Sequence, residues 1–293
     1  MSSNASTTVA ARRSVPPTGA SPELRRLTYR LNRLLLGASG VGALLFLILP
    51  VLIVIPMSFS ESSSLRFPPE GFSLRWYVQV FSDPAWVSAM KTSLVLALIS
   101  STLALIFGSL AAYGLVRGRF VGRDVLQSNF IAPLIIPSVI LAVALYLVYA
   151  MAGILGSFGG LLIAHTLLGV PYVVLIMTVA IRGFDQRIEQ VAFTLGASWI
   201  TMFMRVLLPN LMPSAAAAWI FAFVTSFDEV IVTNFISGTH ETVPKKMFNE
   251  LVLQVNPAIT AIASVLIFVS IVLMLAMAKI TRIRESRNHS PQT

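Results

Sequence analysis

The chain has 293 residues, of which 56% are hydrophobic and only 11% are charged, with a formal net charge of +9 at pH 7. Soluble domains carry about 25% charged residues, so the composition excludes an ordinary soluble protein. Because the chain has no cysteine, disulfides, thiolate nucleophiles and zinc–thiolate sites are excluded as well.

Charge-free stretches divide the chain into predicted membrane spans. They lie at 34–60, 92–116, 125–181, 206–227 and 251–278. A helix needs about 20 apolar residues to cross the hydrocarbon core, and the stretch 125–181 can hold two helices. Four glycines within 153–160 suit a turn between those two. The sequence therefore predicts an all-α, polytopic membrane protein with six spans, near 35–57, 88–116, 130–151, 161–181, 212–236 and 258–280.

The two ends of the chain are predicted to lie outside this transmembrane domain. Residues 1–33 are expected to be a cytoplasmic tail, residues 34–281 the transmembrane domain, and residues 282–293 a second cytoplasmic tail. Residues 2–21, rich in Ser, Thr, Ala and Pro, are expected to be disordered. The first apolar run begins too late and is about twice too long for a cleavable signal, so it is expected to remain as a span.

The distribution of positive charge predicts the orientation of the chain. Cytoplasmic loops of membrane proteins are enriched in Lys and Arg. With the N-terminus inside and six spans, 16 of the 21 Lys and Arg residues lie on the inner side. The charge is thus a topology signal, and it predicts that both termini lie in the cytoplasm. A nucleic-acid partner is not indicated, because no basic face with base-reading groups is visible.

An amphipathic piece follows the first span. Residues 74–81 combine Trp76, Tyr77 and Phe81 with the polar Arg75 and Gln79. Aromatic side chains of this kind suit a helix lying at the headgroup level. Membrane anchoring is the favoured interpretation, and docking of an external partner is the alternative.

The third and fourth spans contain residues that interrupt their apolar pattern. His165 stands alone among apolar residues, and a hydrogen bond to a neighbouring helix is favoured over a proton relay. No second His or carboxylate stands near it at metal-ligand spacing. Pro137 and Pro171 interrupt the two spans; such breaks occur at transporter gates and also as ordinary kinks.

The cytoplasmic loop 183–210 joins the fourth and fifth predicted spans. Its segment 184–209, which we term the elbow, is predicted to form two short helices at a sharp turn. Gly196 tolerates positive φ and can end the first helix, and Ser198 can cap the second. The second helix is expected to run until Pro209 and Pro213 bend the chain into the fifth span. Apolar residues recur at helical spacing in the first helix, at Ile188, Val191, Ala192 and Leu195. From the residues alone, a mechanical lever and an ordinary re-entry loop are equally open.

The fifth predicted span contains two adjacent carboxylates, Asp228 and Glu229. A carboxylate facing hydrocarbon costs about 2.5–3.5 kcal/mol, so both are expected to face protein or water. A small, polar stripe at helical spacing is formed by Thr225, Glu229 and Thr233. One interpretation is a solute path in which the carboxylates attract a cation. The other is structural: the pair holds neighbouring helices or pairs with Lys245 or Lys246.

The elbow resembles the cytoplasmic EAA loop of ABC importer permeases. Gly196 and Leu208-Pro209 stand at that family's spacing, with Ala192 and Ala197 in place. The sequence departs from the pattern at Gln190, where the family usually has glutamate, and at Val191, where it has alanine; Glu189 precedes them. Further motifs resemble the spermidine/putrescine branch, at 71–77, 182–185, 226–230 and 243–247.

This resemblance implies a type I ABC importer permease fold in the bacterial inner membrane, and a set of partners. Two permease chains, here expected to be different, sit on two cytoplasmic ATPase subunits, and a periplasmic binding protein delivers the solute. The chain has no G-x-x-x-x-G-K-[ST] loop, so ATP and Mg are expected on the ATPase. This chain is expected to hold no cofactor and no metal and to catalyse no reaction.

The resemblance also assigns roles to residues. The expected ATPase-coupling residues are Glu189, Gln190, Ala192, Leu195, Gly196, Ala197, Leu208 and Pro209. The candidate solute-pathway residues come from the polar stripe and the adjacent carboxylates, not from the resemblance; they are Thr225, Asp228, Glu229 and Thr233. Polyamines are the first expectation for the solute, with amino acids or opines and ferric ion as alternatives, because specificity rests largely with the binding protein.

Two other classes of function are less favoured. A self-contained channel or secondary transporter would not need the elbow, and the chain shows no obvious inverted repeat. A membrane-embedded enzyme would need a convergent acid–base or metal site. Only Asp228, Glu229 and His165 are available on the spans, and two neighbours on one helix do not form such a site.

Overall fold

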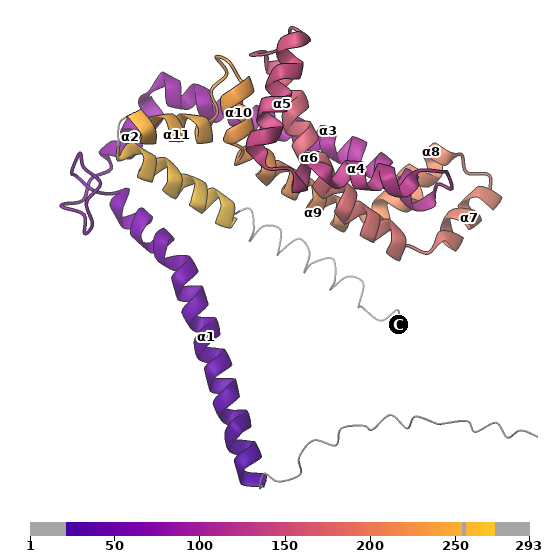
Figure 1. Cartoon of the computed structure of the whole chain (residues 1–293), viewed down its shortest axis with the longest axis horizontal. Helices are drawn as coiled ribbons and strands as arrows, with labels where there is room; N and C mark the ends of the chain where they lie inside the picture. Colours follow the sequence, from indigo (N-terminus) through magenta and orange to yellow (C-terminus); the bar gives the residue numbers. More distant parts are fainter. Residues whose placement is uncertain (1–21, 254–255, 273–293) are drawn as a thin grey trace, which may run out of the picture. The chain divides into compact units, whose positions relative to one another are not determined.

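The structure, a computed structural model, describes residues 22–253 and 256–272 (Figure 1). Every regular element in this described part is helical. Three predictions concern residues outside these ranges. They are the disorder of residues 2–21, the C-terminal tail 282–293 and the end of the sixth predicted span. The chain forms two units, residues 1–53 and 54–293, which we describe separately.

The first unit consists of most of helix α1 (Pro22–Met57). Its apolar part, Leu31–Met57, has 27 residues. At 1.5 Å per residue these span roughly 40 Å, which exceeds the hydrocarbon core of about 30 Å. The first predicted span is therefore confirmed.

The second unit is built around three long helices that pack side by side (Figure 1). They are α3 (Pro84–Arg117), α6 (Phe158–Gly183) and α9 (Leu208–Phe227). Small residues bring them close together: a Cβ atom added to Gly169 of α6 would lie 3.0 Å from the Cβ atom of Ala104 and 3.2 Å from that of Ala222. Such small contacts are typical of membrane helix bundles, and they place the core at the centre of this bundle.

The third predicted span is broken. It consists of α4 (Arg123–Ile135) and α5 (Ser138–Met151), which meet at an angle of 107°. Pro137 lies in the break; it lacks an N–H group, and its ring disfavours a helical conformation of the residue before it. The interruption predicted at Pro137 is therefore confirmed, whereas Pro171 lies inside the continuous helix α6 (Phe158–Gly183) and does not break it.

The helix that forms the fifth span differs at both ends from the predicted range 212–236. The helix begins at Trp199 and continues to Phe227 through α8 (Trp199–Met202), the π-helical turn η1 (Phe203–Leu207) and α9. Pro209 does not end the helix: it lies in the first turn of α9, which follows the π-helical turn η1 directly. The chain then breaks after Phe227, before α10 (Ile231–Ile236), so the expected continuous helix to residue 236 was wrong.

Four described helices are long and apolar enough to cross a membrane, or five if the bent pair α4–α5 counts as one span. The sixth predicted span begins as the shorter apolar helix Ala258–Val272. The prediction of several apolar spans in an all-α chain is confirmed, although the described part contains fewer complete spans than the six expected.

The predicted amphipathic helix is α2 (Arg75–Ser82). Trp76 is buried by protein, and its Nε1–H donates to the backbone oxygen of Ser60 at 2.9 Å. Val78 and Phe81 are exposed. The headgroup position expected for the aromatic residues therefore does not apply to Trp76, which instead fixes the helix to the preceding loop.

Candidate functional site

The elbow forms as two helices joined at Gly196. It lies at one end of the three-helix bundle, where Figure 1 shows α7 (Gln186–Thr194) and α8. The Asp185 carboxylate accepts the N–H of Arg187 at 2.9 Å and so caps α7. The Ser198 hydroxyl accepts the N–H of Thr201 at 3.2 Å and caps α8, as predicted.

The turn between the two helices has the geometry that requires glycine. Gly196 has φ +85°. Its N–H donates to the oxygen of Phe193 at 2.9 Å, and the N–H of Ala197 donates to the oxygen of Ala192 at 3.0 Å. These two bonds form a Schellman motif. The helix stop predicted at Gly196 is confirmed.

Glu189 does not face outward, contrary to its expected role as an ATPase contact. Its side chain is only 4% exposed and forms an ion pair with Arg117, the last residue of α3, at 2.6 Å. The Tyr113 hydroxyl donates to the second carboxylate oxygen of Glu189 at 3.1 Å. The carboxylate is turned inward because the C-terminal end of α3 presents a cation close to the N-terminal turn of α7, where helix dipoles favour both charges.

The outward face of α7 is apolar. Ile188, Val191 and Leu195 are 46%, 55% and 82% exposed, and Gln190 beside them is also exposed. The helical spacing of these residues was visible in the sequence, but it marks an uncovered face and not a face packed inside the chain. Ala192 is the exception, since it is buried in the core cluster.

The other residues that the sequence predicts as ATPase contacts lie around the turn and at the start of α9. A Cβ atom added to Gly196 would have no neighbour within 4 Å, so the space beside the turn is open. Ala197 and Leu208 are partly buried, and Pro209 is exposed in the first turn of α9. Gln190, Leu195 and Gly196 are thus all exposed, whereas Glu189 is buried.

The break after α9 holds the two carboxylates. Asp228 is exposed. The Glu229 carboxylate accepts the N–H of Val232 at 2.8 Å, and the Thr233 hydroxyl donates to the backbone oxygen of Glu229 at 3.0 Å. An acidic side chain that bonds nearby backbone competes with helix continuation, which explains why the chain turns here.

The predicted polar stripe does not form. The break separates Thr225 from Thr233, and Thr233 is fully buried. The Thr225 hydroxyl donates back to the oxygen of Phe221 in its own helix at 2.8 Å. The stripe required one continuous helix, so it was lost together with the predicted continuation to residue 236.

His165 lies at the centre of a buried polar chain that joins four helices. Its Nδ1 and Nε2 atoms lie 2.8 Å from the Ser226 hydroxyl and 3.0 Å from the Thr233 hydroxyl. The hydroxyl of Ser100 in α3 donates to that of Ser226 at 2.9 Å. The hydrogen bond to a neighbouring helix expected for His165 is confirmed, and there are two such bonds.

An aromatic ladder, formed by Trp219, Phe223 and Phe227 of α9, leads along the helix to Asp228. The rings are stacked, with centroid distances of 5.4 Å and 5.7 Å. All three are partly buried. These three aromatic residues stand four positions apart, so the sequence itself carries the signal that places them on one face of a helix.

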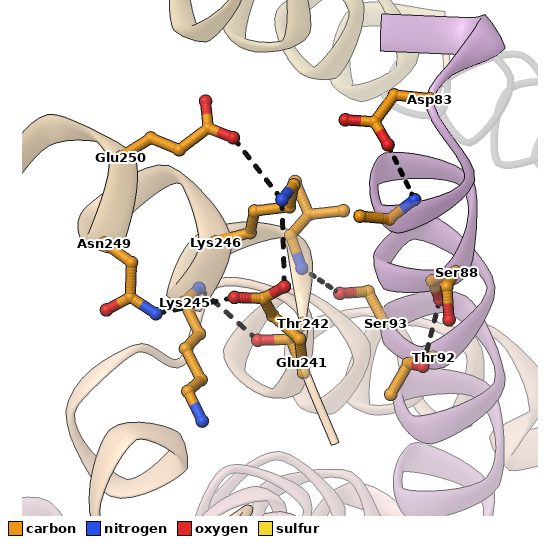
Figure 2. A network of polar contacts seen from close by, with 12 residues as sticks. Asp83, Ser88, Thr92, Ser93, Glu241, Thr242, Lys245, Lys246, Asn249 and Glu250 are labelled. Carbon is orange, nitrogen blue, oxygen red and sulfur yellow. Dashed lines mark hydrogen bonds and ion pairs between the residues drawn. The ribbon is translucent and has the colours of Figure 1, made fainter. Parts of the chain in front are cut away.

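The two lysines near the break have other partners than Asp228 and Glu229. Lys245 of α11 (Val243–Leu253) donates to the Ser237 hydroxyl at 2.7 Å and to the oxygen of Gly238 at 3.1 Å. Figure 2 shows Lys246 between Glu241 and Glu250, at 3.8 Å and 3.4 Å. The hypothesis that Asp228 and Glu229 pair with Lys245 or Lys246 is therefore wrong.

The same region ties α11 to the bundle. The N–H of Val243 donates to the hydroxyl of Ser93 in α3 at 2.8 Å, and Figure 2 shows Ser93 directed at this loop. The Lys246 ammonium also lies 5.0 Å from the ring centre of Trp86. Burial lowers the pKa of Lys245 below its usual value, and Glu241 acts against this shift.

Comparison with known proteins gives one consistent result. The family model described as "Binding-protein-dependent transport system inner membrane component" matches residues 104–287. The chain is 32% identical over 259 residues to the spermidine/putrescine transport system permease protein PotC of Escherichia coli (strain K12), covering 88% of this chain and 98% of that relative. It is 35% identical over 250 residues to the putrescine transport system permease protein PotI of the same strain, covering 83% and 86%.

Solved structures show the same fold. A chain from a bacterial ABC transporter involved in the import of the acidic polysaccharide alginate superposes with a TM-score of 0.63 at 15% identity, over 91% of this chain and 99% of that chain. At this identity the likeness concerns the fold alone. The predicted all-α permease fold of type I ABC importers is confirmed.

Proposed function

We propose a function from one premise, that this chain belongs to the family of binding-protein-dependent transport system inner membrane components. The chain is accordingly an inner-membrane permease subunit of an ATP-driven importer. We propose that it forms half of the solute pathway and couples closure of a separate ATPase to alternating access. The observation that carries the coupling role is the exposed apolar face of α7.

The elbow offers a docking surface that its own chain leaves uncovered. Ile188, Val191 and Leu195 form an apolar stripe on a short helix at the end of the bundle, and exposed apolar patches mark interaction sites. Gly196 leaves space for close approach of a partner, and Gln190 supplies an exposed amide. We assign the ATPase contact to this surface.

The partners and the orientation follow from this assignment. We place the elbow and both termini in the cytoplasm, in agreement with the charge asymmetry of the sequence. The complex would contain an ATPase dimer that holds ATP and Mg, a second and different permease chain, and a periplasmic solute-binding protein. This chain itself would bind no cofactor and catalyse no reaction.

Polyamines are the solute that we propose. The relatives PotC and PotI are named for spermidine and putrescine transport. In this chain the exposed Asp228 follows directly on the aromatic ladder of α9. Carboxylates attract ammonium groups, and aromatic faces bind cations with about 0.5–2 kcal/mol each. The ladder and Asp228 together would favour a flexible cation with several ammonium groups.

Purification of the intact complex tests the proposal. We expect the chain to be recovered from mild detergent with a nucleotide-binding subunit, and ATP hydrolysis to rise when binding protein loaded with spermidine or putrescine is added. Stimulation by an amino acid, an opine or ferric ion in place of a polyamine would reject the solute assignment alone. Solute movement through the purified chain without any ATPase would reject the permease role.

A further inference from the structure

The elbow is held by a third helix besides the two that continue from it. Along the chain it is continuous only with α6 and α9. The structure adds α3, whose last two turns contact both arms of the elbow through side chains. The first arm is α7, before Gly196, and the second arm is α8 with η1, after it. Tyr113 and Arg117 make these contacts, and their i, i+4 spacing puts them on one face of α3.

Arg117 binds the first arm at two points. Its Nε and Nη2 atoms donate to one carboxylate oxygen of Glu189 at 2.9 Å and 2.6 Å. Its Nη2 atom also donates to the backbone oxygen of Phe184 at 2.9 Å. Phe184 is the residue at which α6 ends and the elbow begins, so one guanidinium fixes both this junction and the helix that follows.

Tyr113 binds both arms. Its hydroxyl donates to the other carboxylate oxygen of Glu189, in the first arm. Its ring contacts Trp199 and Phe203 of the second arm edge-on, at centroid distances of 5.8 Å and 6.0 Å. The angle between the arms is therefore set against α3 as well as by the turn at Gly196.

The charged pair is well enclosed, because its side chains are only 13% and 4% exposed. Charge-assisted hydrogen bonds with several donors are strong and directional. Removal of one partner leaves a buried charge without compensation. The first arm can therefore not turn or withdraw from α3 without a large loss of favourable interaction.

We propose that Arg117, together with Tyr113, is a positioning residue that locks the elbow to α3, so that a movement imposed on the elbow displaces α3 along with α6 and α9. This inference rests on the proposed coupling function. Glu189 then acts inside the chain, and the docking contact depends on the neutral Gln190 and the apolar stripe. Glu189, the charged residue that the sequence suggests as an ATPase contact, is instead the residue that anchors the elbow to α3.

The test compares Arg117→Ala with Arg119→Ala in the complete complex. Arg119 is exposed and lies two residues further along, so its loss serves as the matched control. For Arg117→Ala we expect solute uptake per recovered complex to fall about tenfold, within the range typical of coupling between sites. Arg119→Ala is expected to match the wild type.

One further variant separates positioning from mere folding. Tyr113→Phe keeps the ring contacts and removes only the hydroxyl, and it should give a loss of uptake between those of the wild type and Arg117→Ala. Equal uptake by Arg117→Ala and Arg119→Ala, or by Tyr113→Phe and the wild type, would overturn the proposal.

A thermal-unfolding cycle tests the pair independently of transport. The effects of Arg117→Ala and Glu189→Ala on unfolding in detergent are expected to be non-additive, because the two side chains contact each other. Additive effects would overturn the proposal whatever transport shows. A wild-type complex that shows no solute-stimulated hydrolysis would instead reject the proposed function, while the cycle would still report on the lock.

Discussion

The Nε2 atom of His165 in α6 lies 3.0 Å from the hydroxyl oxygen of Thr233 in α10, beyond the break in the chain. Because the Thr233 hydroxyl already donates to the oxygen of Glu229, it accepts a hydrogen from Nε2. The Nδ1 atom lies 2.8 Å from the Ser226 hydroxyl of α9. His165 thereby fastens α10 to the bundle.

Replacement of His165 by Phe should destabilise the protein in detergent. The change keeps a planar aromatic ring but removes two hydrogen bonds between helices, each worth about 1 kcal/mol. We expect thermal unfolding at a lower temperature than in the wild type. Thr166→Val is the control, because its hydroxyl bonds only the oxygen of Leu162 in its own helix. An equal shift in both variants would contradict the fastening role.

A bulky residue at Gly196 should uncouple the complex. Gly196→Trp fills the open space beside the turn, so we expect the chain to reach the membrane while solute-stimulated ATP hydrolysis is lost. Gly122→Trp is the matched control: Gly122 has φ +87°, close to the +85° of Gly196, and open space around its Cβ position. The backbone strain, about 1–2 kcal/mol, is therefore similar. Equal hydrolysis in the two variants would remove the docking assignment.

The tight contact between α3 and α6 predicts a clear difference between two glycines of α3. A Cβ atom at Gly108 would lie 2.7 Å from the Cβ atom of Val173, which cannot swing away, whereas Gly114 has no neighbour within 4 Å. Gly108→Ala should destabilise by about 1–3 kcal/mol through overpacking. Gly114→Ala should be neutral or stabilising by about 0.5–1 kcal/mol. Thermal unfolding of both variants in the same detergent is the measurement.

Neutralising the carboxylates at the break tests the solute path. In the variant Asp228→Asn, Glu229→Gln, the new amide oxygen at 229 can still accept the N–H of Val232, so the fold should be kept. We expect uptake of a polyamine to fall about tenfold, equivalent to about 1.4 kcal/mol. The control is Glu70→Gln, an exposed carboxylate outside the bundle. Unchanged uptake at unchanged membrane abundance would refute the path.

The stability of the loop around Lys245 should depend on alkaline pH. Burial lowers the pKa of Lys245 in the folded protein. In the window between this lowered pKa and the usual lysine value of 10.5, the unfolded chain therefore binds more protons than the folded one. Stability contributed by this group therefore rises with pH across that window. The melting temperature of the wild type relative to Lys245→Met should rise as pH approaches 10.5; a constant difference would contradict the shift.

The elements that depend on local sequence could be predicted well. Charge-free runs longer than the bilayer is thick define α1, α3 and α6 without reference to any neighbour. The elbow turn also depends on local chemistry. Glycine tolerates the positive φ that the chain needs at Gly196, and Ser198 caps the helix that follows it. The exposed stripe of α7 was visible as helical periodicity, although periodicity does not state what covers it.

Tertiary structure decided the orientation of the polar groups. Whether Glu189 or Gln190 faces inward depends on Arg117, which is 72 residues away from Glu189. The partners of His165 lie 61 and 68 residues away. A side chain's local sequence does not specify which distant donor or acceptor will meet it in a low-dielectric interior, where an unpaired group is costly. The sequence by itself therefore determined the spans and the turn, whereas the lock between α3 and the elbow arose only from packing.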